Sequence, residues 1–85
     1  MKRDKMILRI QEQTDRLPIP KQRLVHAYAY TMVSNERKRM GIDDIPGDRP
    51  APGKIGEALL YRLERASGRD LRCIWKFSLD VERYF

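Results

Sequence analysis

The sequence predicts a mainly α-helical fold, in which three helices are followed by a short β element near the C-terminus. Apolar residues recur at helical spacing over residues 5–16, 21–40 and 54–66. Over residues 71–79 they alternate with polar residues instead, which is typical of a half-buried strand. A chain of 85 residues is expected to form one small domain, residues 1–85.

The first predicted helix, residues 5–16, ends at a proline corner. Its buried stripe is formed by Met6, Ile7, Ile10, Thr14 and Leu17. Asp4 is placed to cap the N-terminus of this helix. Pro18 is expected to stop it, because a proline disfavours helical geometry in the residue before it. Pro20 suits the start of the next helix, where its missing N–H leaves no hydrogen bond unmade.

The second predicted helix, residues 21–40, has the longest run of helical spacing in the chain. Its apolar face is formed by Leu24, Val25, Tyr28, Ala29, Met32, Val33 and Met40. Lys38 and Arg39 bring positive charge to the last turn, which is the negative end of the helix dipole. Gly41 is a natural residue to follow the C-terminus of this helix.

Residues 41–53 are predicted to form a long loop, because they hold three prolines and three glycines and show no periodicity. We interpret its aspartates Asp43, Asp44 and Asp48 as turn formers. An EF-hand needs oxygen ligands at alternate positions and a final glutamate, so no metal site is expected here. Most of the loop is interpreted as an extended, solvated connector.

The third predicted helix, residues 54–66, precedes a tail that can be interpreted in two ways. The helix buries Ile55, Leu59, Leu63 and Ala66, and Ser67-Gly68 is expected to close it. At a period of two, the apolar side of the tail consists of Leu71, Cys73, Trp75, Phe77 and Leu79. At a period of 3.6, a helical face is formed by Leu71, Ile74, Trp75, Ser78 and Leu79.

We favour the strand for this tail, because a helix would leave Cys73 and Phe77 away from the apolar face. A lone strand cannot satisfy its backbone hydrogen bonds, and no second strong strand is visible in the sequence. Its partner would be residues 81–85, the irregular loop or another chain. A homodimer paired through the C-terminal strand is therefore expected.

The composition narrows the function classes. The net charge is +6, and residues 1–41 hold ten Lys or Arg against four acids, which suggests a nucleic acid or an acidic protein surface as partner. One cysteine and one histidine cannot supply a disulfide or a tetrahedral zinc site. No segment has the length and apolarity of a membrane span or signal peptide, so a cytoplasmic location is expected. No catalytic arrangement or phosphate-loop pattern is found, and we predict a non-enzyme without a cofactor.

The polar face of the second helix is the first candidate site. Arg23, His26, Tyr30, Ser34 and Arg37 form one row, which Lys38 and Arg39 follow. Arginine and tyrosine side chains can contact phosphates, sugars and base edges, and this row holds no acid. The alternative is an ordinary solvated helix face.

The stretch "GKIGEALLYRLERASGRDLRCI" contains a G-x-x-G, then a helix and then the predicted strand. Over residues 53–77 it resembles the core of a KH RNA-binding module, although the strand and helix that precede the loop in that family are missing. The resemblance implies that the loop clamps a nucleic-acid backbone, with Lys54 adding charge. The alternative, which we favour, makes Gly53 a loop or capping residue and Gly56 a site of close helix packing.

Two function hypotheses follow from these observations. The leading one is a small basic regulatory protein of phage or plasmid type that binds DNA or RNA through the second helix and the N-terminus. Its predicted contact residues are Lys2, Arg3, Arg23, His26, Tyr30, Arg37, Lys38, Arg39, Lys54 and Tyr61. The alternative is a protein-binding inhibitor or adaptor that uses the proline-rich loop and aromatic anchors. These anchors are Trp75, Phe77, Tyr84 and Phe85.

Overall fold

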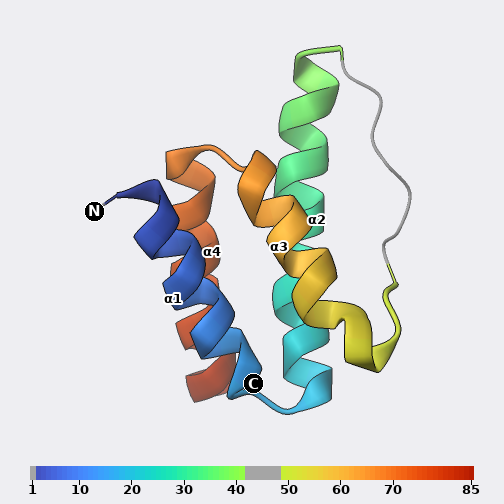
Figure 1. The fold of residues 1–85 in the computed structure, drawn as a ribbon, viewed down its shortest axis with the longest axis vertical. Coiled ribbons are helices and arrows are strands. Elements are labelled where there is room, and N and C mark those ends of the chain that lie inside the picture. The colour runs from blue at the N-terminus through green and yellow to red at the C-terminus, as the bar shows by residue number, and fades with distance from the viewer. Residues whose placement is uncertain (1, 42–48) are drawn as a thin grey trace.

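Helices make up most of the chain that the structure describes. The computed structural model describes residues 2–41 and 49–85. Its elements there are α1 (Arg3–Asp15), α2 (Ile19–Arg39), the short 3₁₀ helix η1 (Pro52–Lys54), α3 (Ile55–Arg65) and α4 (Gly68–Tyr84). In Figure 1, α1 and α4 run side by side in the same direction, while α2 runs in the opposite direction and α3 packs across it. None of these described helices is long and apolar enough to cross a membrane.

The three predicted helices correspond to α1, α2 and α3, with every boundary within two residues of its expected position. Gly41 follows α2 with φ of +74°, which confirms it as the residue after the helix. Pro20 lies in the first turn of α2, also as expected. Asp4 is not the cap of α1, because Lys2 occupies the N-cap position and Asp4 lies in the first turn.

All four helices contribute to one core. Its buried apolar side chains are Ile7, Ile10, Leu17, Val25, Ala29, Val33, Leu59, Leu63, Ala66, Leu71, Ile74 and Val81. Two of the buried hydroxyl groups bond to their own helices: Thr14 Oγ1 donates to the Ile10 carbonyl oxygen at 2.7 Å, and Ser78 Oγ donates to that of Trp75 at 2.6 Å. These bonds to their own helices remove the cost of burying an unpaired hydroxyl.

The predicted C-terminal strand is wrong, and with it the fold class of three helices plus a β element, because residues 71–79 form the middle of α4. Ser67 begins this helix rather than closing α3. Its Oγ accepts a hydrogen bond from the Asp70 backbone N–H at 3.1 Å, which satisfies a donor of the first turn. From there the buried positions Leu71, Ile74 and Ser78 follow helical spacing.

The alternation that suggested a strand arises because α4 packs against two helices at once. Phe77 stacks on Tyr28 of α2, with the ring centroids 4.2 Å apart and the planes 5° from parallel. Trp75 lies on the other flank, where it lines a cleft together with residues of α1. The covered arc of α4 is therefore wider than one stripe, and Trp75 and Phe77 mark its two edges.

Two further expectations depended on the strand. The backbone groups of α4 bond within the helix, so a homodimer paired through a C-terminal strand loses its basis. The KH resemblance also fails, because α4 stands where that module has a strand.

Close packing does not require Gly56 to be a glycine, since an added Cβ would meet Asp15 Oδ1 at an ordinary 3.9 Å. Gly53 lies within η1, and Lys54 is the N-cap of α3.

Candidate nucleic-acid interface

The polar row of α2 is largely covered by its neighbours. His26 is 1% exposed and Ser34 is 6% exposed. Arg23, Tyr30 and Arg37 are half-buried. The expectation of an exposed contact face on α2 is therefore wrong for His26 and Ser34. A role of this row in nucleic-acid binding stays a prediction.

Arg62 of α3 covers Tyr30 of this row. It is 3% exposed, and its guanidinium carbon lies 4.6 Å from the centroid of the Tyr30 ring and 5.2 Å from that of Tyr61. Arg65 lies 3.4 Å from the Tyr61 centroid and donates from Nη1 to the Tyr61 carbonyl oxygen at 2.8 Å. These cation–π contacts engage Tyr30 and Tyr61, which were both predicted to contact nucleic acid.

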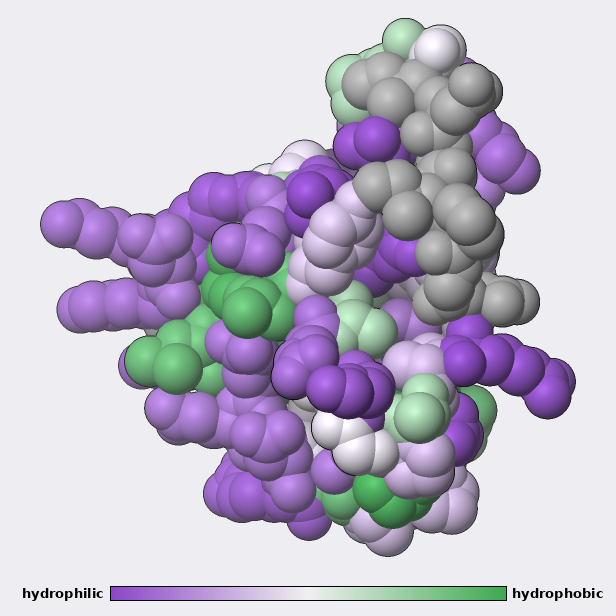
Figure 2. Space-filling model, turned by 45° about the vertical axis from the view of Figure 1, so that its right-hand side comes forward, coloured by the Kyte–Doolittle hydropathy of each residue, from purple (hydrophilic) through white to green (hydrophobic). Residues whose placement is uncertain are grey.

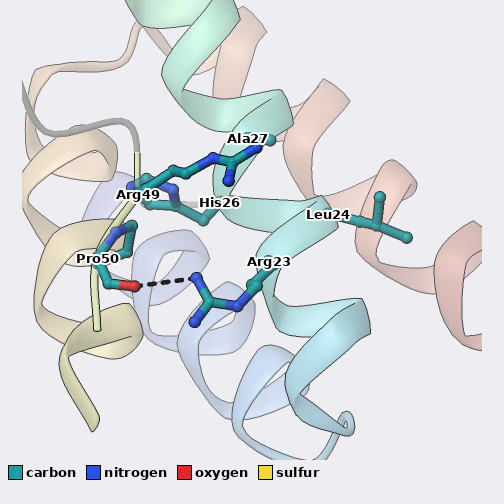
Figure 3. A pocket seen from close by; sticks show the side chains of 6 residues that line it. All are labelled: Arg23, Leu24, His26, Ala27, Arg49 and Pro50. Atoms are coloured by element: carbon teal, nitrogen blue, oxygen red, sulfur yellow. Dashed lines mark hydrogen bonds between the residues drawn. The ribbon is translucent and has the colours of Figure 1, made fainter. Parts of the chain in front are cut away.

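A cleft lies beside the first half of α2. It encloses about 540 Å³ and is lined by Arg23, Leu24, His26, Ala27, Arg49 and Pro50. Figure 3 shows Arg23 reaching the Pro50 carbonyl oxygen, to which its Nη1 donates at 2.9 Å. This hydrogen bond ties the residues before η1 to α2 and gives Arg23 a structural partner.

Arg3 is engaged at the C-terminal end of α3. Its guanidinium donates to the carbonyl oxygens of Leu63 at 3.3 Å and Glu64 at 2.6 Å, and also to that of Ala66. The last carbonyl groups of a helix have no partner within the helix, so Arg3 caps α3 from another element. Lys2, the residue before it, is exposed.

Three more of the predicted contact residues lie at the surface. Lys38 and Arg39 are exposed in the last turn of α2. Lys54 is exposed too, and its Nζ lies 3.7 Å from Glu57 Oε2. An exposed ion pair of this kind contributes little to stability, so Lys54 remains able to exchange its partner for a phosphate.

The cleft beside Arg39 brings opposite charges together. It encloses about 310 Å³ between the end of α2 and the start of α4. Arg39 and Arg69 line it together with Glu36 and Asp70. Two cations facing two acids leave no local excess of positive charge, and this cleft does not favour a phosphate.

Two smaller clefts follow the contact between α1 and α4, which we call the α1–α4 seam. One encloses about 140 Å³ and is lined by Arg3, Met6, Gly68, Leu71 and Arg72. The other encloses about 190 Å³ and is lined by Arg9, Glu12, Gln13, Arg16 and Trp75. Four arginines and one acid, Glu12, line these two clefts, and Glu82 of α4 adds a second acid at the seam, so the arginines remain in excess.

Part of the seam is held by a hydrogen-bond network. Gln13 is 1% exposed, and its Nε2 donates to Glu82 Oε2 of α4 at 3.0 Å. Its Oε1 accepts a hydrogen bond from Nη2 of Arg16. Arg9 and Arg72, by contrast, are exposed and make no hydrogen bond or ion pair with any residue in the described ranges. They are the cations of the seam that are open to an external anion.

Sequence reasoning did not single out Arg9, Arg16 or Arg72. Arg9 and Arg16 are seven residues apart, which is about two helical turns, so their shared face could have been found from the sequence. Arg72 lies in the tail that was interpreted as a strand, so its position beside α1 could not be inferred.

The aromatic residues of the protein-binding alternative differ in exposure. Trp75 and Phe77 are half-buried. Tyr84 is 72% exposed and Phe85 is 65% exposed, with the Phe85 ring set edge-on to Phe77 at 6.1 Å. The face drawn in Figure 2 is mainly hydrophilic, and its hydrophobic residues form small separate patches.

Comparison of the chain with protein-family models, with curated proteins and with solved structures finds no match. Within residues 2–41 and 49–85, no group of three His, Cys, Asp or Glu side chains is placed to hold a metal ion.

Proposed function

We propose that this protein is a small regulatory protein that binds DNA or RNA, and that the α1–α4 seam supplies its main phosphate contacts. The observation that carries the proposal is the excess of four arginines over two acids, Glu12 and Glu82, along the seam, in a chain of net charge +6. Lysine and arginine side chains that neutralise phosphates supply most of the affinity of such proteins. Arg9 and Arg72 suit this role because no described residue competes for them.

The proposal moves the main contacts away from α2. Arg23 donates to Pro50, and Tyr30 lies against Arg62, so contact with a nucleic acid would first require these interactions to break. Lys2 is exposed next to Arg3, which lines the seam, and stays as a secondary phosphate contact.

The test is fluorescence anisotropy of labelled duplex DNA and labelled single-stranded RNA, each titrated with the protein at low and at near-physiological salt. We expect binding to persist at near-physiological salt. The logarithm of the binding constant should fall linearly with the logarithm of the salt concentration, with a slope that corresponds to several phosphate contacts. Weak binding that appears only at low salt, equally for both ligands, would reduce the positive charge to a non-specific background.

A charge-matched pair of variants locates the contacts. Arg9→Ala with Arg72→Ala removes two cations of the seam, whereas Arg49→Ala with Arg83→Ala removes two exposed cations elsewhere. We expect the seam variant to weaken binding about tenfold or more and to lower the salt slope by about two. The control pair should change both quantities much less. Equal losses would mean that net charge alone governs binding.

Failure to bind either nucleic acid would favour the second candidate, a protein-binding modulator. The observation behind that candidate is the exposure of two adjacent aromatic side chains, Tyr84 at 72% and Phe85 at 65%. Aromatic residues of this kind are enriched among the anchors of protein interfaces.

A further inference from the structure

The ring of Trp75 stands apart from the other aromatic rings of the described chain. Tyr28 stacks on Phe77 at 4.2 Å, Phe77 and Phe85 meet edge-on at 6.1 Å, and Arg62 and Arg65 lie against Tyr30 and Tyr61. Tyr84 is the most exposed of them and has Arg83 at 6.0 Å. Trp75 alone among them has neither a ring partner nor a cation over its ring.

The position of Trp75 is unusual as well. It is half-buried and packs against the core, yet it lines the 190 Å³ cleft of the α1–α4 seam together with Arg9 and Arg16. One part of the ring packs against the core, which orders it, and another part faces the basic cleft. A ligand that stacks on it loses little conformational entropy.

We propose that Trp75 is a stacking platform for one unpaired nucleobase, so that the seam prefers single-stranded nucleic acid to duplex. The inference rests on the proposed function and specifies its ligand. Proteins that bind single strands combine a basic groove that follows the backbone with aromatic side chains on which bases stack. The bases of a duplex already stack on one another and cannot reach such a ring without being extruded.

The two flanking arginines are placed to hold the backbone on either side of that base. Arg16 is the C-cap residue directly after α1 and follows Arg9 by seven residues, which corresponds to about 10 Å along the helix axis. Gln13, fixed by Glu82 of α4, orients Arg16, whereas Arg9 is free to follow a phosphate. Glu12 also lines the cleft, where its charge offsets that of one of the two arginines.

The size of the cleft also favours a single base. Pockets for drug-sized ligands enclose about 300–1,000 Å³. This cleft, at about 190 Å³, is smaller than that range and has room for one ring system rather than for a large cofactor.

The experiment uses the single tryptophan of the chain as its own probe. Unlabelled oligothymidylate, oligouridylate and a duplex of equal length are titrated into the unaltered protein while Trp75 emission is recorded. We expect both single strands to quench the emission, and the duplex to quench it far less. The comparison of thymidylate with uridylate separates DNA from RNA as the source of the base.

A variant tests the energetic role of the ring. Trp75→Leu keeps an apolar side chain at the edge of the core and removes the stacking surface. We expect it to weaken binding of labelled single strands roughly tenfold or more, with little change for labelled duplex. Circular dichroism establishes that the variant is folded, and if it is not, the quenching of the unaltered protein decides alone.

The possible failures can be told apart. Single strands that bind tightly without quenching Trp75, or that bind the Trp75→Leu variant as well as the original, would overturn the stacking platform and leave the phosphate-binding seam intact. An equal loss for duplex and single strand in the variant would also overturn it. If none of the three ligands bound to the protein, both proposals would be overturned.

Discussion

Arg62 and Arg9 carry the same guanidinium group in opposite surroundings. Arg62 is 3% exposed, and its guanidinium carbon lies 4.6 Å from the centroid of the Tyr30 ring, between α3 and α2. Arg9 is exposed at the α1–α4 seam and has no hydrogen-bond or ion-pair partner in the part of the chain that the structure describes. One side of the bundle thus uses arginine and tyrosine to fill an interface between helices, and the other leaves arginines at an open seam.

Charge density along a sequence therefore does not identify a binding surface. α2 holds five Lys or Arg and one acid, and it is the most basic of the described helices. Its Arg23 nevertheless donates to Pro50, and its Tyr30 is covered by Arg62. α1 and α4 mix charges of both signs, yet their packing brings four arginines and one acid to the two clefts of the seam. Packing decides which cations remain available.

The largest expected effect comes from removing the buried arginine. Arg62→Ala should lower the free energy of unfolding by about 2–3 kcal/mol. It removes a cation–π contact, and it leaves the space that the packed side-chain stem occupied unfilled. For a domain of this size the melting temperature would fall by about 10 °C or more. Thermal unfolding followed by circular dichroism measures the change.

The matched control for this prediction is Arg9→Ala, which removes the same side chain from the seam. Its effect on stability should lie within about 0.5 kcal/mol, as for other surface substitutions. Arg62→Met, which keeps an unbranched apolar stem, separates packing from charge. If Arg62→Ala proved as mild as Arg9→Ala, the distinction between a structural and an available arginine would not hold.

A smaller effect is expected at Arg3, which belongs to both regions because it lines the seam and caps α3. Arg3→Ala should lower the free energy of unfolding by about 1–2 kcal/mol, since it leaves carbonyl groups at the end of α3 without their charged donor. Lys2→Ala, the neighbouring exposed cation, should have almost no effect. Urea unfolding of the two variants and the original protein provides the comparison.

Arg3→Lys identifies what the cap depends on. Lysine keeps the positive charge near the negative end of the α3 dipole but cannot spread donors over three carbonyl groups as a planar guanidinium does. We expect it to restore less than half of the loss. Full restoration would show that charge near the helix end, and not the forked geometry, stabilises this contact.

The sequence was sufficient to place α1, α2 and α3, because each has one apolar stripe bounded by proline, glycine or serine. It was insufficient for α4, where Phe77 and Trp75 are covered by two different helices and imitate an alternating pattern. The helical signal was nevertheless present: Ser67 followed three residues later by Asp70 is a helix N-terminus signature. We interpreted Ser67 as the end of one helix when it begins the next.

The candidate site was harder to predict, because the error in the tail moved its residues. Interpreted as a strand, residues 71–79 gave no reason to place Arg72 or Trp75 beside α1. Without knowledge of the helix that packs on it, the polar row of α2 looked exposed, although its His26 is only 1% exposed. A helical sequence pattern gives the faces of each helix, but which polar face is covered depends on how the helices cross, and that is a property of the whole bundle.

The smallest expected effect concerns the flank of α2 that faces α4, where Tyr28 packs on Phe77. Burial raises the pKa of the Tyr28 phenol above its ordinary value, and the nearby Cys73 and Asp70 raise it further. The folded state therefore keeps this proton to higher pH than the unfolded chain does. Below about pH 10 both states are protonated and stability does not depend on this group, whereas above it the unfolded chain ionises first and stability falls.

Tyr28→Phe removes this titration, so the variant should lose less stability than the original protein between about pH 8 and about pH 10.5. The midpoint of urea unfolding at the two pH values measures the difference. Tyr84→Phe is the matched control, because Tyr84 is 72% exposed and its removal should leave the loss unchanged. If Tyr28→Phe lost as much stability as the original protein, the flank of α2 toward α4 would be as open to solvent as the α1–α4 seam. The enclosure of α2 would then be limited to the side that Arg62 covers.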